Sequence, residues 1–211
     1  MLRCLPAPAP LAFDPEDAQH LGDGGVLLWE DVFTVETAER ARAAILAADA
    51  QGQLTPAGIG LGASLDRTVR GDRTTWLEPG DLDGALAPLR ADLEAILESA
   101  RRDLWLPAHD LELQAAVYPA DGAAYARHLD ALRDDNERLL TVIAWLNPRW
   151  QPHHGGQLRV WRCDHPTDIA PHAGRVAVFR SDAVPHAVLP CWAPRVALSG
   201  WIRRAPHVPI A

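Results

Sequence analysis

The chain has 211 residues, of which 48% are hydrophobic, and this length and composition predict one domain with a substantial buried core. The formal net charge is −8, so the chain lacks the basic surplus that attracts nucleic-acid phosphates, and we expect no nucleic-acid partner. Its three cysteines are widely spaced, and no apolar run reaches the length of a membrane span. These features argue against a disulfide framework and against a membrane protein, and they predict a cytoplasmic location.

The N-terminal quarter of the chain predicts an arm, a strand and a helix. Residues 1–20 are rich in proline and alanine, which favours a flexible arm. The apolar run at 26–29 predicts a short buried strand. Thr34 is suited to cap a helix that extends to about residue 50, with small apolar residues on one side.

A glycine-rich stretch follows and leads into a second helix. Residues 53–72 contain several glycines and few large apolar side chains, a composition typical of a mobile lid. Strand chemistry returns at 73–77. Helical spacing of apolar residues then extends from 82 to 104, with Pro88 in the first turn.

After Pro107 the pattern changes to short β-segments separated by clusters of Gly, Pro, Asn and Asp. Because helices come first and strands follow, the expected fold class is α+β, mainly β, with helices packed against a sheet sandwich or barrel. The predicted strands are 111–118, 139–146, 157–161, 175–179, 184–189 and 195–202.

Two histidines and one aspartate form the pattern with the clearest chemistry. In a strand, His128 and Asp130 would point to the same face, and His186 would approach from another strand. Such a set can occupy one face of an Fe(II) octahedron and leave the opposite face open for a co-substrate and O₂. Arg195, expected on the next antiparallel strand beside His186, could hold an acidic co-substrate. Taken alone, a His-x-Asp spacing also arises by chance in many proteins.

Several segments, taken in chain order, carry a more specific pattern. They are Arg70-Gly71-Asp72-Arg73-x-Thr75-Trp76, Tyr118-Pro119-x-x-Gly122-x-x-Tyr125-x-x-His128-x-Asp130, Trp145-Leu146-Asn147, Gly155-Gly156-x-Leu158-Arg159, Pro185-His186-x-Val188-x-Pro190 and Arg195-x-x-x-Ser199-x-Trp201. Together they resemble the 2-oxoglutarate/Fe(II)-dependent oxygenases, specifically the prolyl hydroxylase branch with the hypoxia-sensing enzymes and their bacterial relatives. The resemblance covers roughly residues 50–202.

This resemblance implies a fold and a domain organisation. The fold would be a double-stranded β-helix, or jelly roll, with supporting helices packed on one sheet. We expect a single domain over residues 1–211, with the jelly-roll core at about 107–204.

The resemblance also implies roles for individual residues. Fe(II) would be held by His128, Asp130 and His186, and Arg195 would pair with the distal carboxylate of 2-oxoglutarate. Further contacts with 2-oxoglutarate would come from Tyr118, Ser199 and Trp145, the last standing where close relatives carry a tyrosine. The residues that would face the substrate are Arg70, Asp72, Trp76, Arg138 and Trp201.

The implied activity is the hydroxylation of a prolyl residue in a protein, with consumption of O₂, release of succinate and CO₂, and ascorbate as a candidate reductant. A translation elongation factor is the first protein partner to consider. Two alternatives stay open. One is an oxygenase that acts on a free amino acid or another small molecule, and the other is a non-catalytic jelly-roll protein that binds or senses a metal or ligand.

Overall fold

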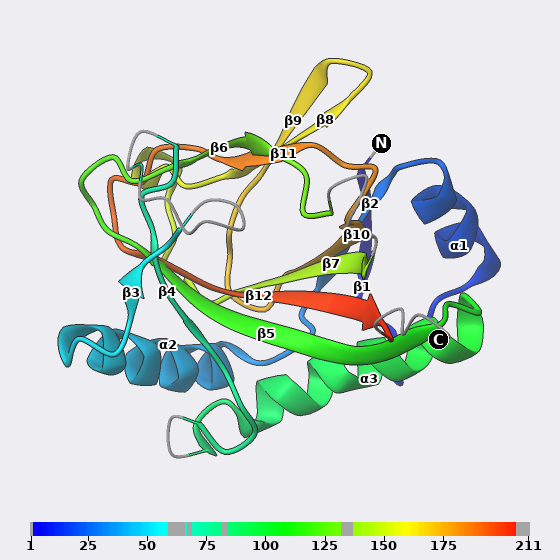
Figure 1. The fold of residues 1–211 in the computed structure, drawn as a ribbon, viewed down its shortest axis with the longest axis horizontal. Coiled ribbons are helices and arrows are strands. Elements are labelled where there is room, and N and C mark those ends of the chain that lie inside the picture. The colour runs from blue at the N-terminus through cyan, green and yellow to red at the C-terminus, as the bar shows by residue number, and fades with distance from the viewer. Residues whose placement is uncertain (1, 59–65, 67–68, 82–83, 132–136, 206–211) are drawn as a thin grey trace, which may run out of the picture.

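Two β-sheets packed face to face form the centre of the protein, and helices cover the outer face of the larger sheet (Figure 1). This computed structural model describes residues 2–58, 66, 69–81, 84–131 and 137–205. Apart from one parallel pair at an edge, the paired strands are antiparallel. The arrangement is the jelly roll that the resemblance implies.

Every strand expected after Pro107 is present, and the described residues after Pro107 form two further strands, 125–128 and 165–169. The larger sheet has the order β1 (Leu2–Pro6), β2 (Val26–Glu30), β10 (Val176–Arg180), β7 (Arg138–Trp145), β12 (Arg195–Arg204), β5 (Ala108–Tyr118), β4 (Arg73–Trp76) and β3 (Thr55–Pro56). The smaller sheet has the order β6 (Tyr125–His128), β11 (His186–Val188), β8 (Leu158–Arg162) and β9 (His165–Ile169). A short 3₁₀ helix, η2 (Pro152–His154), precedes β8. β9 was not expected because its residues are mostly exposed and lack apolar alternation.

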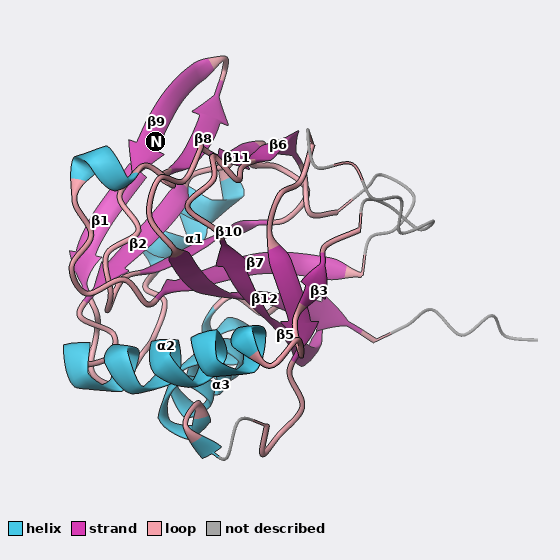
Figure 2. Ribbon diagram, turned by 90° about the vertical axis from the view of Figure 1, so that its left-hand side faces the viewer, coloured by secondary structure: helices cyan, strands magenta, loops and turns pink. Residues whose placement is uncertain are grey.

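Two helices, α2 (Val35–Ala50) and α3 (Ala87–Asp103), lie along the outer face of the larger sheet (Figure 2). The predicted cap of α2 is confirmed, because the Thr34 side chain accepts a hydrogen bond from the Thr37 N–H. Pro88 lies in the first turn of α3 as expected, although the helical spacing of apolar residues in the sequence already begins at 82. Gly84 has a positive φ of 73°, which is incompatible with a continuous helix at that point.

The central strand β7 has apolar side chains on both of its faces. Val142 and Ala144 pack toward the helices, whereas Ile143 and Trp145 pack between the two sheets. Because both faces are buried, β7 appears in the sequence as a continuous apolar run. Thr141 is the buried polar exception in this strand, and it belongs to the site described below.

The prediction of a flexible arm at residues 1–20 is wrong, because the described residues of this range form a strand and most of a helix. Leu2–Pro6 is the edge strand β1, which pairs in parallel with β2, and the helix α1 (Pro15–Gly22) follows it with a capping box at its start. The prolines are compatible with this order. Pro6 ends an edge strand and Pro15 begins a helix, and neither position needs a backbone N–H donor. Proline content alone therefore misled the prediction.

The sheet core is also broader than the expected range of 107–204. β1 and β2 extend the larger sheet beyond β10, and β3 and β4 extend it beyond β5. The two ends of the expected lid at 53–72 are thus attached to the sheet. Its middle, residues 59–65 and 67–68, lies outside the described residues. In the described part of the chain, no helix is both long and apolar enough to cross a membrane.

We predict that Leu93→Ala lowers the free energy of unfolding by about 2–5 kcal/mol, because it leaves a cavity under α3. Leu93 is only 2% exposed in the core between α3 and the larger sheet. Val35→Ala is the control, since Val35 is 54% exposed and its loss should change stability by less than about 0.5 kcal/mol. Urea unfolding measures both, and equal midpoints for the two variants would contradict this account of the core.

Candidate functional site

The metal centre begins with two neighbouring strands of the smaller sheet. His128 ends β6, His186 begins β11, and the two residues are direct partners in this antiparallel pair. Such partners have Cβ atoms about 5 Å apart. The centroids of the two imidazole rings lie 4.2 Å from each other. The strand register therefore brings together two histidines that are far apart in the sequence.

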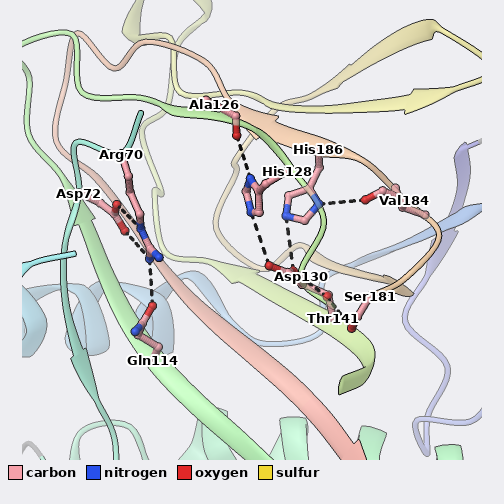
Figure 3. A network of polar contacts seen from close by, with 10 residues as sticks. All are labelled: Arg70, Asp72, Gln114, Ala126, His128, Asp130, Thr141, Ser181, Val184 and His186. Carbon is pink, nitrogen blue, oxygen red and sulfur yellow. Dashed lines mark hydrogen bonds and ion pairs between the residues drawn. The ribbon is translucent and has the colours of Figure 1, made fainter. Parts of the chain in front are cut away.

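Asp130 completes the set, but not in the way the sequence indicated. It lies in a bend after the end of β6, so the alternation of a strand does not orient it. Its Oδ1 lies 3.5 Å from Nε2 of His128 and its Oδ2 lies 3.5 Å from Nε2 of His186. The three ligand atoms all lie within 4.8 Å of one another, and the side chains point toward a common centre (Figure 3).

Backbone carbonyls orient both histidine rings. Nδ1 of His128 lies 2.8 Å from the carbonyl oxygen of Ala126, and Nδ1 of His186 lies 3.0 Å from that of Val184. Because a carbonyl oxygen can only accept a hydrogen bond, we assign the proton of each neutral ring to Nδ1. This leaves both Nε2 lone pairs directed at the centre, where a metal ion would bind them.

The electrostatics of the site favour a metal cation. Burial raises the pKa of Asp130, but the neighbouring imidazoles of His186 and His128 and the Thr141 hydroxyl outweigh it, and the pKa falls well below its usual range. Burial lowers the pKa of His186, which favours the neutral ring. One carboxylate and two neutral imidazoles are the ligands that Fe(II) takes in oxygenases with open coordination positions.

A hydrogen-bond chain behind Asp130 was not found from the sequence. The Thr141 hydroxyl donates to Oδ2 of Asp130 at 2.7 Å, and its oxygen lies 2.9 Å from the Ser181 hydroxyl (Figure 3). Both hydroxyls are buried. The only sequence signal was a lone threonine inside the apolar run of β7, and a threonine is common enough in strands to carry no prediction.

A cavity of about 110 Å³ joins this centre to the larger sheet. His186 stands on the smaller sheet, whereas Arg195 begins β12 of the larger sheet, where it pairs with Tyr118. The expectation that His186 and Arg195 lie side by side on adjacent strands is therefore wrong. They face the same cavity from opposite sheets, together with Tyr118 and Ser199.

Arg195 is a buried cation that calls for an anionic ligand. It is 4% exposed, its Nε donates to the carbonyl oxygen of Gly156 at 2.9 Å, and its Cζ lies 4.9 Å from the centroid of the Tyr118 ring. Among the described residues, no carboxylate forms an ion pair with it. An unpaired buried charge is costly. The site therefore fits the distal carboxylate of 2-oxoglutarate, which would neutralise Arg195.

Tyr118 adds a hydroxyl donor beside this arginine. Burial raises its pKa well above the usual value, so the phenol keeps its proton. Gly156 allows the close approach on the other side, because it has a φ of 72° and a Cβ there would lie 2.9 Å from both Cδ of Arg195 and Sγ of Cys191. A side chain at position 156 would therefore displace the guanidinium.

The residues expected to face a substrate separate into two groups. Trp76, Arg138 and Trp201 line the cavity as one contiguous group, in which Trp76 is exposed and Trp201 is buried. The Trp76 and Trp201 rings lie 5.7 Å apart, and Cζ of Arg138 lies 3.8 Å from the Trp201 ring centroid. Arg70 and Asp72 also line the cavity, but they bind each other, with 2.8 Å between Nε and Oδ1.

Trp145, expected to contact 2-oxoglutarate, does not appear among the residues that line the cavity. It is fully buried in the core between the sheets, and its indole N–H has no hydrogen-bond partner among the residues that the structure describes. The contact with 2-oxoglutarate that the resemblance implies for Trp145 stays a prediction, which the position of its side chain outside the cavity lining does not favour.

Comparison with known proteins agrees with this geometry. Residues 113–203 match the 2OG-Fe(II) oxygenase superfamily. The crystal structure of a Pseudomonas putida prolyl-4-hydroxylase superposes with a TM-score of 0.75 at 36% identity, over 89% of this chain and 97% of that one. A Trichoplax adhaerens prolyl hydroxylase, solved with a hypoxia inducible factor peptide fragment, has the same fold, with a TM-score of 0.79 at 23% identity over 88% and 86% of the two chains. Human prolyl hydroxylase EGLN3 is 33% identical over 143 residues, which are 64% of this chain and 59% of the human protein.

The fold and the site define a jelly-roll protein with a metal centre of two histidines and one carboxylate. The chain belongs to the 2OG-Fe(II) oxygenase superfamily, a class of 2-oxoglutarate-dependent dioxygenases. Its match to EGLN3 spans less than two-thirds of that human protein.

We predict that Thr141→Val weakens metal binding about tenfold or more, since outer partners of metal ligands commonly contribute that much. Valine keeps the shape of the buried side chain but cannot donate to Asp130. Titration with Co²⁺, followed by calorimetry, measures the dissociation constant. An unchanged constant would remove the hydroxyl chain from metal binding.

We also predict an order of reactivity for the three thiols. Cys4 and Cys163 are exposed, whereas Cys191 is buried and burial raises its pKa to about 11. Only the thiolate is nucleophilic, so iodoacetamide at neutral pH should label Cys191 last. Peptide mass spectrometry over a labelling time course checks the order. Fast labelling of Cys191 in the folded protein would contradict the packing around Gly156.

Proposed function

We propose that this protein hydroxylates a prolyl residue in a polypeptide, with Fe(II), 2-oxoglutarate and O₂ as cofactor and co-substrates. The observation that carries the proposal is one cavity that holds both a convergent metal-ligand set and a buried, unpaired Arg195. The similarity to the Pseudomonas putida prolyl-4-hydroxylase supports the choice of proline.

One set of side chains in the cavity would bind the metal, and another would bind the co-substrate. His128, Asp130 and His186 would hold Fe(II), and Arg195 with the Tyr118 hydroxyl would hold the distal carboxylate of 2-oxoglutarate. When bound together, the metal and the co-substrate supply the oxidising chemistry that inserts one oxygen atom into a C–H bond. Apolar side chains of the same cavity keep water from the reacting atoms; they are Ile143, Leu158 and Val188.

The open side of the cavity supports a polypeptide substrate. Trp76 is 49% exposed and packs against the buried Trp201, so the Trp76 ring offers an apolar surface against which a pyrrolidine ring can pack. Arg138 is held over Trp201 and donates to Glu112 at 3.1 Å. A proline fixes its own φ and has no N–H, so it can present its ring carbons to such a surface in an extended chain.

We propose a protein with an exposed prolyl loop as the partner, and a translation elongation factor as the first candidate. Ascorbate is proposed as the reductant that keeps the iron in the Fe(II) state, and the cytoplasm as the location. Two names among the similar proteins support a protein substrate: the human relative is a prolyl hydroxylase, and the Trichoplax adhaerens enzyme was solved with a peptide.

The test incubates the protein with Fe(II), 2-oxoglutarate and peptides that carry the prolyl loops of an elongation factor, with His186→Ala as the inactive control. The expected result is the gain of one oxygen atom on proline and an equal amount of succinate, both by mass spectrometry. Oxidation of only a free amino acid or small metabolite would favour the small-molecule alternative. Metal binding without any consumption of 2-oxoglutarate would favour a non-catalytic binding protein.

We predict that Arg195→Gln raises the KM for 2-oxoglutarate on the order of a hundredfold, since one partner of a buried charge pair is lost. Arg195→Lys should recover little, because an ammonium group lacks the planar fork of the guanidinium. Co²⁺ affinity should stay unchanged in both variants. Initial rates of 2-oxoglutarate consumption measure the effect, and a wild-type KM in Arg195→Gln would exclude this anchor.

We predict that Trp201→Ala raises the KM for the peptide on the order of tenfold, because an aromatic side chain at the centre of a contact commonly contributes at least that much. Trp105→Ala is the matched control, since Trp105 is 87% exposed and does not line the cavity. Steady-state kinetics with the peptide measure both variants. Equal KM values for the two variants would place the peptide elsewhere.

A further inference from the structure

We propose that Arg70 and Tyr125 are positioning residues that hold the metal ligand His128 in its binding orientation. The Tyr125 and His128 rings are stacked, with 3.7 Å between their centroids and 18° between their planes. Cζ of Arg70 lies 4.5 Å from the centroid of the same Tyr125 ring. The phenol ring thus links a fixed guanidinium to a metal-binding imidazole.

Arg70 is held firmly enough to act as a support. Its Nε and Nη2 donate to the two carboxylate oxygens of Asp72 at 2.8 and 3.1 Å, and Nη2 also donates to Oε1 of Gln114 at 3.2 Å (Figure 3). The Asp72 side chain is fully buried. A bidentate pair of this kind fixes the plane of the guanidinium. Because the guanidinium of Arg70 already binds Asp72 and Gln114, its donors are used within the protein. This is expected of a residue that positions its neighbours and not of one that captures substrate.

The backbone around Arg70 reinforces the contact. The Gly71 N–H donates to the Ala124 carbonyl at 2.9 Å, and the Ala126 N–H donates to the Val69 carbonyl at 2.8 Å. Arg70 and Tyr125 also form a β-bridge between these two bonds. The segment 69–71 therefore lies against the edge of β6, the strand that carries His128.

Glycine at position 71 makes this approach feasible. A Cβ there would lie 3.1 Å from Cα of Ala123, which is tighter than ordinary packing of a side chain against a backbone. Each residue of the motif Arg70-Gly71-Asp72 thus has a structural role. The arginine stacks on Tyr125, the glycine allows its segment to approach β6 closely, and the aspartate fixes the arginine.

The stack limits rotation of His128 from the side opposite the metal-ligand set, and it adds to the hydrogen bond from Nδ1 to the Ala126 carbonyl and to the contacts of the ring with Asp130 and His186. His186 is 3% exposed and packs against Phe179, with 5.0 Å between the ring centroids, so it has no need of such a support. Groups that orient a metal-binding histidine commonly contribute about tenfold or more to metal affinity. This inference rests on the proposed function only in treating His128 as a metal ligand.

The test compares Co²⁺ dissociation constants, by calorimetry on the full chain without peptide, for Tyr125→Phe, Tyr125→Leu, Arg70→Gln and Arg127→Gln. Tyr125→Phe keeps the stacked ring and should bind as the wild type does, whereas Tyr125→Leu and Arg70→Gln should bind about tenfold more weakly. Arg127→Gln is the matched control, because Arg127 lies on β6 as Tyr125 does but its guanidinium stacks on a different aromatic ring, Trp161, at 4.7 Å. Thermal unfolding of the metal-free proteins checks that each variant folds.

Three outcomes separate this proposal from others. Wild-type Co²⁺ affinity in Tyr125→Leu and Arg70→Gln, with a raised KM for the peptide, would overturn it and make both residues substrate contacts. A weakened affinity in Arg127→Gln equal to that in Arg70→Gln would also overturn it, because the effect would then be a general loosening of β6. If the variants follow the expected order but no peptide is ever hydroxylated, the positioning role stands and the proposed function fails. If Arg70→Gln does not fold, the two Tyr125 variants decide the question.

Discussion

The pairing of β6 with β11 is the constraint on which the site depends. Its register sets His128 opposite His186, and a slip of one residue would turn one imidazole to the other face of the sheet. The same two strands are short, so their alignment needs help from outside the pair. β8 supports β11 on one side, and the segment 69–71 supports β6 on the other. The convergence of the three candidate metal ligands thus follows from how four pieces of chain are aligned, more than from the identity of the side chains alone.

The two sheets carry different parts of the site. The smaller sheet and the bend after β6 present the candidate metal ligands, and the larger sheet presents Arg195 and Tyr118 as partners on neighbouring strands. The cavity lies between them, within a core of apolar side chains. Helices α2 and α3 pack on the outer face of the larger sheet, and Arg42 of α2 also donates to Asn147 and Pro194 in the loops at its edge, so these helices help to hold the sheet in shape.

Sequence patterns could predict α2, because burial of one face leaves a helical period in the chain, and β7, because burial of both faces leaves a continuous apolar run. They could not predict β9, which is exposed, or β1, whose prolines resemble those of a disordered arm. The candidate metal ligands and Arg195 were recognisable, and His186 was expected on a strand other than that of His128, but the placement of Asp130 and Arg195 was not predicted. Asp130 reaches the centre from a bend and Arg195 from the opposite sheet, and both depend on contacts distant in sequence. The Thr141–Ser181 hydrogen-bond chain left no pattern in the sequence, because the role of a buried hydroxyl depends on the group it contacts in the folded protein.

The position of Arg195 and Tyr118 as register partners in the middle strands of the larger sheet has a consequence for selectivity toward small acids. A ligand that touches both the metal and this pair must span the gap between two sheets, and that gap is maintained by the whole apolar core. The fixed separation between the candidate metal ligands and the Arg195–Tyr118 pair would therefore limit the length of the acid that can bind. A shorter or longer dicarboxylate would have to shift entire strands to fit. A change of co-substrate length in a descendant of this protein would therefore require a different pair of anchoring residues at a different position between the two sheets, because a rotamer change at Arg195 would not be enough.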